Sequence, residues 1–359
     1  MISVIVPTYF GGSGLHQCVR ALAAELDRGD EIIVVADGES DRAWEGLDDP
    51  SVRVLVNPTR RGPAYARNRG AEAAKGDLLF FVDADCVVHP GTLARIRREF
   101  QADPTLSALI GSYDDAPAHP SFLSQYRNLL HHYIHQRSRD QIRTFWSACG
   151  AVRRKAFFTA GGFDERYEEP CIEDIDLGYR LSDAGHRIRI FKDLQIKHLK
   201  EWTAASIVRT DVLLRAAPWT ELLLRRGVVE DNLNTSKRSR VSLAAVATAL
   251  ILWLLSVLLL AAGAVGMAGG VALGAAAWTG AAIAFNHPFY RFLYQKRGGL
   301  FALRAVPWHF LYFACAGAGA MLGAIRFASR KAQPSRQVLI APELPRTPHM
   351  VTPRQARAA

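Results

Sequence analysis

Two carboxylates, Asp83 and Asp85, directly follow the apolar run from Leu78 to Val82. Such a run is typical of a buried strand, and ligands of open α/β sheets bind in the crevice beyond the carboxyl ends of the strands. Carboxylate oxygens suit Mg²⁺ or Mn²⁺, and Mg²⁺ usually binds through one or two carboxylates together with substrate phosphates. The D-A-D spacing therefore indicates a metal and diphosphate site. Taken by itself, it is also compatible with aspartates that only cap a turn.

A second acidic group, Glu173-Asp174 with Asp176, opens a segment that has the pattern of a helix. Acidic side chains near a helix N-terminus are stabilised by the helix dipole, so a purely structural role is one interpretation. The other interpretation is chemical, because a carboxylate beside a bound acceptor can take its proton as a general base.

The elements that must position these carboxylates alternate along the first hundred residues. Strands are expected over residues 2–6, 31–35, 52–56 and 78–82, and helices over 15–26, 41–47, 64–74 and 93–100. This order predicts an α/β fold with a mainly parallel, doubly wound sheet covered by helices on both faces. The nearly continuous apolar strands agree with burial on both sides. Beyond residue 106 the pattern is less regular, with strands expected over 145–152 and 187–191.

Four motifs at strand ends are more specific than the D-A-D alone. The chain lacks the G-x-G-x-x-G dinucleotide fingerprint and the P-loop sequence. In their place it has V-I-V-P-T-Y, I-I-V-V-A-D-G-E-S-D, A-x-A-R-N-x-G and F-V-D-A-D, in that order. Together they resemble the donor half of family-two, GT-A-fold glycosyltransferases, and the similarity runs from about residue 2 to residue 202. The fold that the resemblance implies is GT-A-like, with membrane helices after it as in many members.

The resemblance implies a donor site for a nucleotide-diphospho-sugar. Thr8 and Tyr9 would line the nucleotide pocket, and Asp37 would bond the base. The family's frequent D-D-G-S is Ala36-Asp37-Gly38-Glu39 here, which leaves the identity of the base open. Arg67 or Asn68 would fix the nucleotide, and the D-A-D pair would meet ribose, diphosphate and metal. The full donor-binding set is Pro7, Thr8, Tyr9, Asp37, Arg67, Asn68, Asp83 and Asp85.

The resemblance also implies a catalytic base and an acceptor side. Glu173-Asp174 resembles the family's E-D motif, whose aspartate is the base, so that role falls on Asp174. His198 stands where related enzymes supply a further metal or diphosphate contact beside Asp85. Trp146, Glu173 and Trp202 are expected on the acceptor side, although an aromatic such as Trp146 is equally compatible with the core. The Gln-x-x-Arg-Trp pattern is absent, so processive polymer synthesis is not supported.

A long apolar segment follows the expected catalytic part. No charged residue occurs from Val241 to Asn286, which is enough for two membrane crossings of about 20 residues each. They are expected over 241–264 and 269–285, with the turn at Gly263, Gly266, Gly269 and Gly270. A third apolar stretch, 306–325, either crosses or forms a re-entrant or interfacial helix. Basic residues before the first crossing predict a catalytic domain on the cytoplasmic side.

Charge and cysteine usage exclude other classes. The net charge is +10, but much of the excess lies beside the apolar segments and in the tail, where it suits lipid head groups and topology rather than nucleic acid. The first residues resemble a strand and show no signal peptide. The five cysteines are scattered without a C-x-x-C pair, so neither a disulfide framework nor a zinc site is indicated.

The sequence thus predicts three regions: a GT-A-like domain over 1–235, a membrane region over 236–328, and a basic, proline-rich, disordered tail over 329–359. The expected function is inverting, Mg²⁺- or Mn²⁺-dependent transfer of a sugar from a nucleotide-diphospho-sugar to a lipid-linked or envelope glycan acceptor. The expected location is the inner (cytoplasmic) membrane, as a multi-pass protein. A nucleotidyltransferase of related fold and a non-catalytic membrane scaffold are the alternatives.

Overall fold

The structure is a computed structural model that describes residues 1–9, 12–38, 42–47 and 49–331. Glu39, Ser40 and Asp41 of the second motif, and residues 332–359 of the expected tail, lie outside the described residues. The chain divides into two compact units. In the part of the chain that the structure describes, one unit contains residues 1–120 and 139–201, and the other contains residues 121–138 and 202–331.

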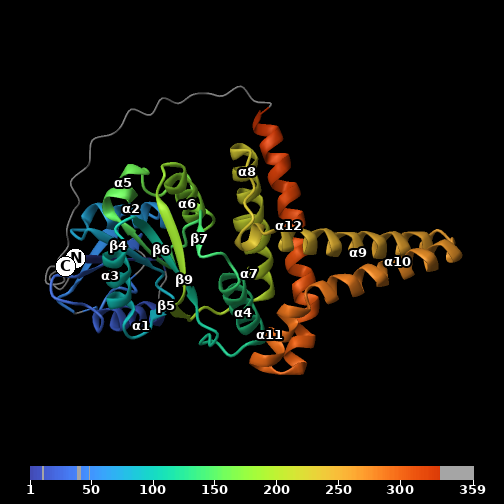
Figure 1. Ribbon diagram of the computed structural model, residues 1–359, viewed down its shortest axis with the longest axis horizontal. Coiled ribbons are helices and arrows are strands. Elements are labelled where there is room, and N and C mark those ends of the chain that lie inside the picture. Colours follow the sequence, from blue (N-terminus) through green and yellow to red (C-terminus); the bar gives the residue numbers. More distant parts are fainter. Residues whose placement is uncertain (10–11, 39–41, 48, 332–359) are drawn as a thin grey trace. The chain divides into compact units, whose positions relative to one another are not determined.

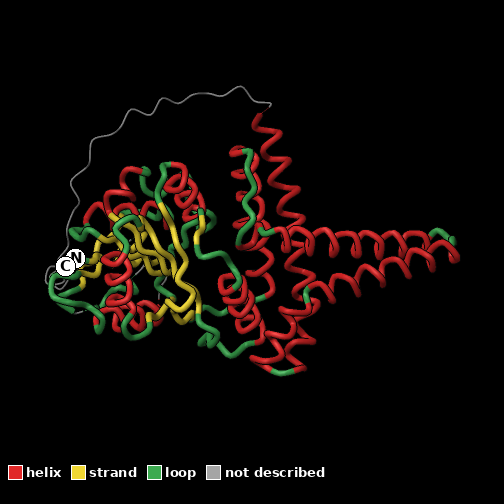
Figure 2. The backbone as a smooth tube through the Cα atoms, viewed as in Figure 1, coloured by secondary structure: helices red, strands yellow, loops and turns green. Residues whose placement is uncertain are grey.

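The first unit is built on one nine-stranded sheet with the order β3-β2-β1-β4-β8-β6-β9-β5, and β7 pairs with β9 (Figures 1 and 2). Its first half follows the predicted pattern, with β1, β2, β3 and β4 in parallel register. The sheet as a whole is mixed, because β8 lies antiparallel between β4 and β6, and β5 and β7 run antiparallel to β9. The strands are β1 Ile2–Thr8, β2 Glu31–Asp37, β3 Val52–Asn57, β4 Leu78–Val82, β5 Cys86–Val88, β6 Leu106–Tyr113, β7 Gln141–Ile142, β8 Cys149–Arg153 and β9 Arg187–His198.

Both faces of this sheet are buried, which explains the continuous apolar strands. On β4, Phe80 belongs to one core and Phe81 to the other, because successive side chains point to opposite faces. Helices α1 (Gly12–Ala23) and α3 (Thr92–Ala102) contribute to the core with Phe80. Helices α2 (Pro63–Ala73), α5 (Arg154–Thr159) and α6 (Glu173–Asp183) contribute to the other. The doubly wound architecture is therefore confirmed.

Two expected elements differ from the structure. Residues 42–47 form a turn rather than a helix, since Gly46 has φ 82°. Residues 145–148 are not part of a strand, because the strand begins only at Cys149. Strand β6 was not expected; Ser107, Gly111 and Ser112 interrupt its apolar residues, which weakens its apolar pattern.

Helix α6 lies close to the segment before β8, and Gly178 makes this approach possible. A Cβ at Gly178 would lie 2.1 Å from the backbone nitrogen of Phe145 and 2.4 Å from the carbonyl carbon of Thr144. Backbone atoms cannot move aside as a flexible side chain can. The small residue at position 178 therefore sets the height of α6 over the sheet.

Replacing Gly178 with alanine is expected to destabilise the first unit by about 1–3 kcal/mol, the range typical of an overpacked core. Thermal unfolding of the full chain in detergent measures the effect. Gly14→Ala in α1 is the matched control, because its added Cβ has no neighbour nearer than 3.4 Å. Equal unfolding temperatures for the two variants would contradict the argument.

The second unit is helical in the part that the structure describes. Its helices are α4 Phe122–Gln136, α7 Ala204–Arg209, the π-helix η1 Thr210–Ala216, α8 Ala217–Arg226, the short η2 Leu233–Thr235, α9 Lys237–Ala261, α10 Val265–Phe285, α11 His287–Arg297 and α12 Gly299–Lys331. Helices α9, α10 and α12 are long and apolar enough to cross a membrane. Figure 2 shows α9 and α10 as a helical hairpin.

The apolar segments differ from expectation at their turns. Of the four glycines expected at the turn, only Gly263, with φ 77°, lies between α9 and α10. Gly266, Gly269 and Gly270 lie inside α10, where glycine is tolerated in apolar helices. The third apolar stretch belongs to one continuous helix that contains Pro307.

The expected boundary at residue 235 also differs from the division in the structure, which places it at Glu201. Segment η1–α8 packs along α12, where Gly319 and Gly323 carry no side chains. A Cβ at Gly319 would lie 2.5 Å from the Cβ of Ala216, and one at Gly323 would lie 2.4 Å from the carbonyl oxygen of Ala217. Small residues let helices approach closely, so residues 202–235 join the apolar helices instead of the sheet.

Candidate active site

The motif residues of the first four strands meet at one edge of the sheet. Thr8 ends β1, Asp37 ends β2, and Asp83 directly follows β4. Thr8 is in register with Ala36, and Asp37 with Asn57. Because these strands are parallel, their carboxyl ends form the crevice in which ligands of such sheets bind.

A buried arginine joins the two acidic motifs. Nη2 of Arg67, on α2, donates to Oδ1 of Asp83 at 2.7 Å, and Nη1 donates to Oε1 of Glu173 at 2.8 Å. The side chains of Arg67 and Glu173 are each 5% exposed. Burial opposes the charge of the guanidinium, but the adjacent carboxylates of Asp83 and Glu173 outweigh it and raise the pKa of Arg67. One guanidinium thus holds together residues that lie 90 positions apart.

The structure shows hydrogen-bond partners of Glu173 that the sequence did not predict. Its second oxygen accepts the backbone N–H of Cys171 at 2.8 Å, so both carboxylate oxygens are engaged. A side chain held in this way keeps its neighbours in position. The acceptor-side role of Glu173 stays a prediction.

Asp174 follows in the first turn of α6. Its Oδ2 accepts the N–H of Ser147 at 3.1 Å, and its Oδ1 accepts the N–H of Ile175 at 2.7 Å. Burial and the negative charge of Glu173 raise the pKa of Asp174 to about 7, against the opposing effects of the Ser147 N–H and of Arg67. A carboxyl group with a pKa near neutrality is well matched to proton transfer at neutral pH.

Strand pairing brings Asp85 and His198 together. Cys86 of β5 is in register with His198 of β9, and the backbone N–H of Leu199 donates to the carbonyl of Asp85 at 2.8 Å. Nε2 of His198 lies 3.6 Å from Oδ2 of Asp85. Burial opposes ionisation of Asp85, but the nearby His198 outweighs it and lowers the pKa of that carboxyl to about 2. The expected pair of metal ligands is thus adjacent.

The donor atoms fit a divalent cation. The side chain of Asp85 is 41% exposed. Its carboxylate oxygen and the imidazole nitrogen of His198 are close enough to bind the same ion. Carboxylates suit Mg²⁺ and Mn²⁺, and an imidazole ligand favours the transition metal. The Cys86 sulfur also lies nearby. Burial and the charges of Asp85 and Asp83 raise the pKa of the Cys86 thiol well above its usual value.

Tyr113, at the end of β6, orders the imidazole and was not found from the sequence. Its ring stacks on His198 with 4.2 Å between centroids and 13° between planes. The ring of Tyr113 also meets that of Trp146 in a T-shaped contact, with 4.8 Å between centroids and 90° between planes. No motif contains Tyr113. The available signal was its place at the carboxyl end of a strand, and that strand itself was missed.

We expect Tyr113→Leu to weaken Mn²⁺ binding about tenfold, the lower limit typical when a residue that orients a metal ligand is lost. The full chain is titrated with Mn²⁺ and the free ion is measured by electron paramagnetic resonance. Tyr113→Phe keeps the stacked ring and should bind Mn²⁺ as the unchanged protein does. If the leucine and phenylalanine variants bind Mn²⁺ equally, the ring does not position His198.

Two predicted donor residues hold loops in this structure. The carboxylate of Asp37 accepts from Nδ2 of Asn57 at 2.9 Å and from the N–H groups of Arg61 and Gly62 at 3.0 and 2.7 Å. Asn68 exchanges two hydrogen bonds of 2.8 Å with the backbone of Phe163. Both residues therefore fix the segments around α2, and their contacts with a nucleotide stay predictions.

The remaining predicted residues lie at different places. Thr8 is buried, whereas Tyr9 is 41% exposed beneath the guanidinium of Arg60, 4.5 Å from the ring centroid. Pro7 is partly buried on the same strand. Trp202 belongs to the other compact unit, where its backbone N–H donates to Oγ of Ser124 at 2.8 Å. The acceptor-side role of Trp202 stays a prediction.

Known proteins resemble this chain in its first part. Residues 3–160 match the family described as "Glycosyl transferase family 2". The chain is 30% identical over 220 residues to the pre-mycofactocin glycosyltransferase of Mycobacterium tuberculosis, covering 56% of this chain and 44% of that protein. It is 34% identical over 118 residues to glycosyltransferase GlyG of Streptococcus pneumoniae, covering 32% and 39%. The matches thus span less than half the length of these relatives.

One solved structure resembles nearly the whole chain. Mannosyltransferase PcManGT from Pyrobaculum calidifontis, in complex with GDP-Man and Mn²⁺, superposes with a TM-score of 0.54 at 18% identity. The match covers 92% of this chain and 87% of that one. At this identity the likeness concerns the fold alone. The predicted resemblance to family-two glycosyltransferases and the predicted GT-A fold are thereby confirmed.

Proposed function

We propose that this chain is an inverting, metal-dependent glycosyltransferase that moves a sugar from a nucleotide-diphospho-sugar to a lipid-linked acceptor. The observation that carries the proposal is the bridge from Arg67 to Asp83 and Glu173, because it unites the D-A-D and E-D motifs in one site. The names of the relatives support sugar transfer. The GDP-Man and Mn²⁺ bound by the structural neighbour support a nucleotide-sugar donor and a divalent metal.

Asp174 is the proposed general base. Its carboxylate takes the proton from the acceptor oxygen while that oxygen attacks the anomeric carbon from the face opposite the leaving group, which inverts the configuration. The N–H of Ser147 holds one carboxylate oxygen in place. Glu173 raises the proton affinity of this carboxylate, and Arg67 limits the increase. Glu173 and Arg67 thus act as positioning residues for Asp174.

The diphosphate is proposed to lie at the end of β4. Asp85 and His198 would hold Mg²⁺ or Mn²⁺ there, and a bound ion supplies Lewis acidity that stabilises negative charge on the departing diphosphate. Arg67 fixes the carboxylate of Asp83, and Tyr113 fixes the plane of His198. Thr8, Tyr9 and the other donor residues are proposed to hold the nucleotide at the adjoining strand ends.

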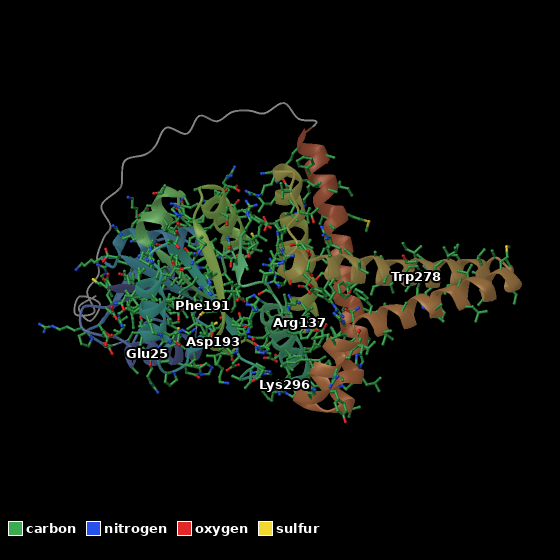
Figure 3. The ribbon with its side chains drawn as sticks, in the orientation of Figure 1. Glu25, Arg137, Phe191, Asp193, Trp278 and Lys296 are labelled. Atoms are coloured by element: carbon green, nitrogen blue, oxygen red, sulfur yellow. The ribbon has the colours of Figure 1, made fainter. Side chains whose placement is uncertain are left out.

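The proposed location is the inner (cytoplasmic) membrane, with the catalytic unit in the cytoplasm. Helices α9 and α10 carry exposed apolar side chains along their length, including Trp278, which is 44% exposed (Figure 3). Lys237, Arg238 and Arg240 lie in the first turn of α9, and such residues favour the cytoplasmic side. A lipid-linked acceptor is proposed because a soluble acceptor would not require these helices.

Purified protein in membranes tests the proposal when it is incubated with a panel of labelled nucleotide-sugars and a bacterial lipid extract. We expect label in the lipid fraction together with release of a nucleoside diphosphate, and loss of both in Asp85→Ala. Release of pyrophosphate would indicate a nucleotidyltransferase. If no donor is transferred or hydrolysed, the chain is not this enzyme.

The rate of transfer is expected to rise with pH and to level off above about pH 7. The reason is that Asp174 must be deprotonated to act as a base, and burial together with Glu173 raises its pKa to about 7. Initial rates at saturating donor from pH 5 to pH 9 measure this profile. A transferase that keeps its full rate at pH 5 would exclude Asp174 as the group that controls it.

A further inference from the structure

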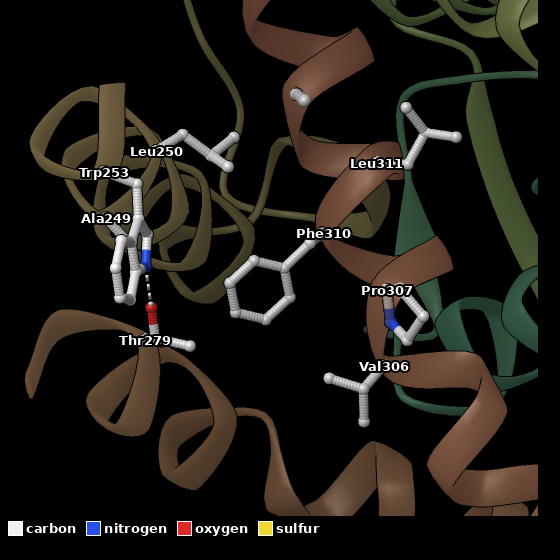
Figure 4. Close-up of a pocket in the computed structure, with 9 residues that line it drawn as sticks. Ala249, Leu250, Trp253, Thr279, Val306, Pro307, Phe310 and Leu311 are labelled. Carbon is white, nitrogen blue, oxygen red and sulfur yellow. Dashed lines mark hydrogen bonds between the residues drawn. The ribbon is translucent and has the colours of Figure 1, made fainter. Parts of the chain in front are cut away.

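A large apolar cavity lies among α9, α10 and α12 in the second unit (Figure 4). Its volume is about 490 Å³, within the range of pockets that bind small ligands. Phe310 and Ala314 of α12 lie on one side, and Trp253 of α9 lies on the other. The indole N–H of Trp253 donates to the hydroxyl of Thr279 at 3.2 Å, so the polar groups of this wall satisfy each other. The cavity therefore suits hydrocarbon rather than a polar molecule.

The position of this cavity along α9 matches the depth of lipid chains. Ala249 and Trp253 lie 12 and 16 residues after Lys237, which places them roughly 18–24 Å along the helix at 1.5 Å per residue. The hydrocarbon core of a bilayer is about 30 Å thick. Leu250 on the same wall is 41% exposed, so the cavity is open to the surroundings of the helices.

A second, smaller cavity of about 60 Å³ lies beside the first turn of α9 and the C-terminal end of α10. Arg238 and Ser242 of α9, Asn286 after α10, and His309 of α12 line it, with Tyr133 of α4. No carboxylate lines it, and Arg238 forms no ion pair with an acidic side chain among the described residues. The hydroxyl of Tyr133 is buried without a hydrogen-bond partner in the described part of the chain. A cation and an unused donor favour an anion here.

The two cavities share α9 and α12. Ser242 and Ala249 are seven residues apart on α9, or about 10 Å along its axis. On α12, His309 and Phe310 are neighbours that face different cavities. An anion in the smaller cavity and a hydrocarbon chain in the larger one would thus belong to one elongated amphiphile.

We infer that these two cavities bind a lipid with a phosphate head group and a long hydrocarbon chain, and that this lipid is the acceptor. The acceptor role rests on the function proposed above, whereas the binding site rests on the second unit alone. Arg238 and Tyr133 bind the phosphate, and the wall from Trp253 to Ala314 binds the chain.

Photocrosslinking of the full chain in phosphatidylcholine nanodiscs tests the site, with hexadecyl phosphate that carries a diazirine in its chain as the probe. We expect crosslinks in peptides of α9 and α12. Ala314→Phe fills the cavity and should reduce their yield about tenfold, whereas Ala318→Phe, one turn further on an exposed position, should not. Unchanged thermal unfolding of both variants shows that the helices still assemble.

The head-group cavity is tested separately by Arg238→Gln, with Arg240→Gln as the matched control. Loss of a charge-assisted contact should weaken binding of the phosphate probe about tenfold, but leave binding of a diazirine-tagged hexadecanol unchanged. The inference is wrong if crosslinks are the same in Ala314→Phe and Ala318→Phe, or if Arg238→Gln affects phosphate and alcohol equally.

Three further outcomes separate this inference from the proposed function. Competition by phosphatidylglycerol as strong as that by unlabelled hexadecyl phosphate would identify a structural phospholipid and overturn the acceptor assignment. Sugar transfer to a lipid that persists unchanged in Ala314→Phe would overturn the site and leave the transferase intact. Absence of transfer to any acceptor, with the crosslinks as expected, would overturn the function and the acceptor role but retain the binding site.

Discussion

Replacing Asp174 with asparagine is expected to lower the rate of sugar transfer by about 10²–10⁴-fold, the range that general base catalysis contributes. Asparagine has nearly the same shape and still accepts one hydrogen bond, but it cannot take a proton. The N–H of Ser147, which donates to Asp174 at 3.1 Å, can still be satisfied. The measurement is the initial rate at saturating donor and acceptor, alongside the affinity for the donor, which should stay the same.

Asp183→Asn is the matched control, since Asp183 ends the same helix and pairs with Arg143 on the surface. It should transfer sugar at the unchanged rate. A transferase that keeps more than a tenth of its rate in Asp174→Asn would exclude Asp174 as the base. Equal loss in both variants would point to damage to α6 instead of loss of a proton acceptor.

Stability provides an independent readout of the same carboxylate. Because its pKa is raised to about 7 in the folded protein, the folded state disfavours the ionised form relative to the unfolded chain, in which aspartate titrates near 4. The stability of the unchanged protein contributed by this group therefore falls as the pH rises from about 4 through about 7. Asp174→Asn removes that loss. The difference in unfolding temperature, variant minus unchanged protein, should therefore be larger at pH 8 than at pH 5.

The donor half of the fold was predictable because its signals are local. Strands β1, β2 and β4 are apolar runs that end in or beside a motif residue, and α1, α2 and α3 have helical patterns. The part after β6 follows no such rule. Residues Phe145 and Trp146 are apolar but lie in an irregular segment, because α6 presses on its backbone at Gly178. An apolar run alone does not distinguish a strand from such a buried segment.

The sequence predicts which residues belong to the candidate site, but it does not predict which of them contact one another. The motifs name Arg67, Asp83 and Glu173, whereas the ion-pair bridge among them depends on how α2 and α6 meet over the sheet. The adjacency of Asp85 and His198 depends on the pairing of β5 with β9, and neither β5 nor that pairing has a signal in the sequence. Tyr113 belongs to no motif, so only the coordinates reveal its stacking on His198.

The largest loss of stability is expected when the ion-pair bridge from Arg67 to Asp83 and Glu173 is broken. Replacing Arg67 with methionine is expected to destabilise the first unit by about 3–5 kcal/mol, the cost typical of breaking a buried ion pair by removing one partner. Glu173 would remain 5% exposed with no cation beside it, next to Asp174. Thermal unfolding and hydrogen–deuterium exchange of the full chain in detergent measure the effect, and the exchange should increase in peptides that contain α2 and α6.

Companion variants show whether charge or packing is responsible. Arg166→Met removes an arginine whose ion pair with Asp164 is at the surface, with the arginine side chain 84% exposed, and should change stability by less than about 1 kcal/mol. In Arg67→Met combined with Glu173→Gln, the buried carboxylate is also neutral, so part of the loss should be recovered. Arg67→Lys keeps the charge but offers no planar fork for two carboxylates and should be intermediate. If the double variant is no more stable than Arg67→Met, the loss comes from packing, and the two acidic motifs are not held together by the charge of Arg67.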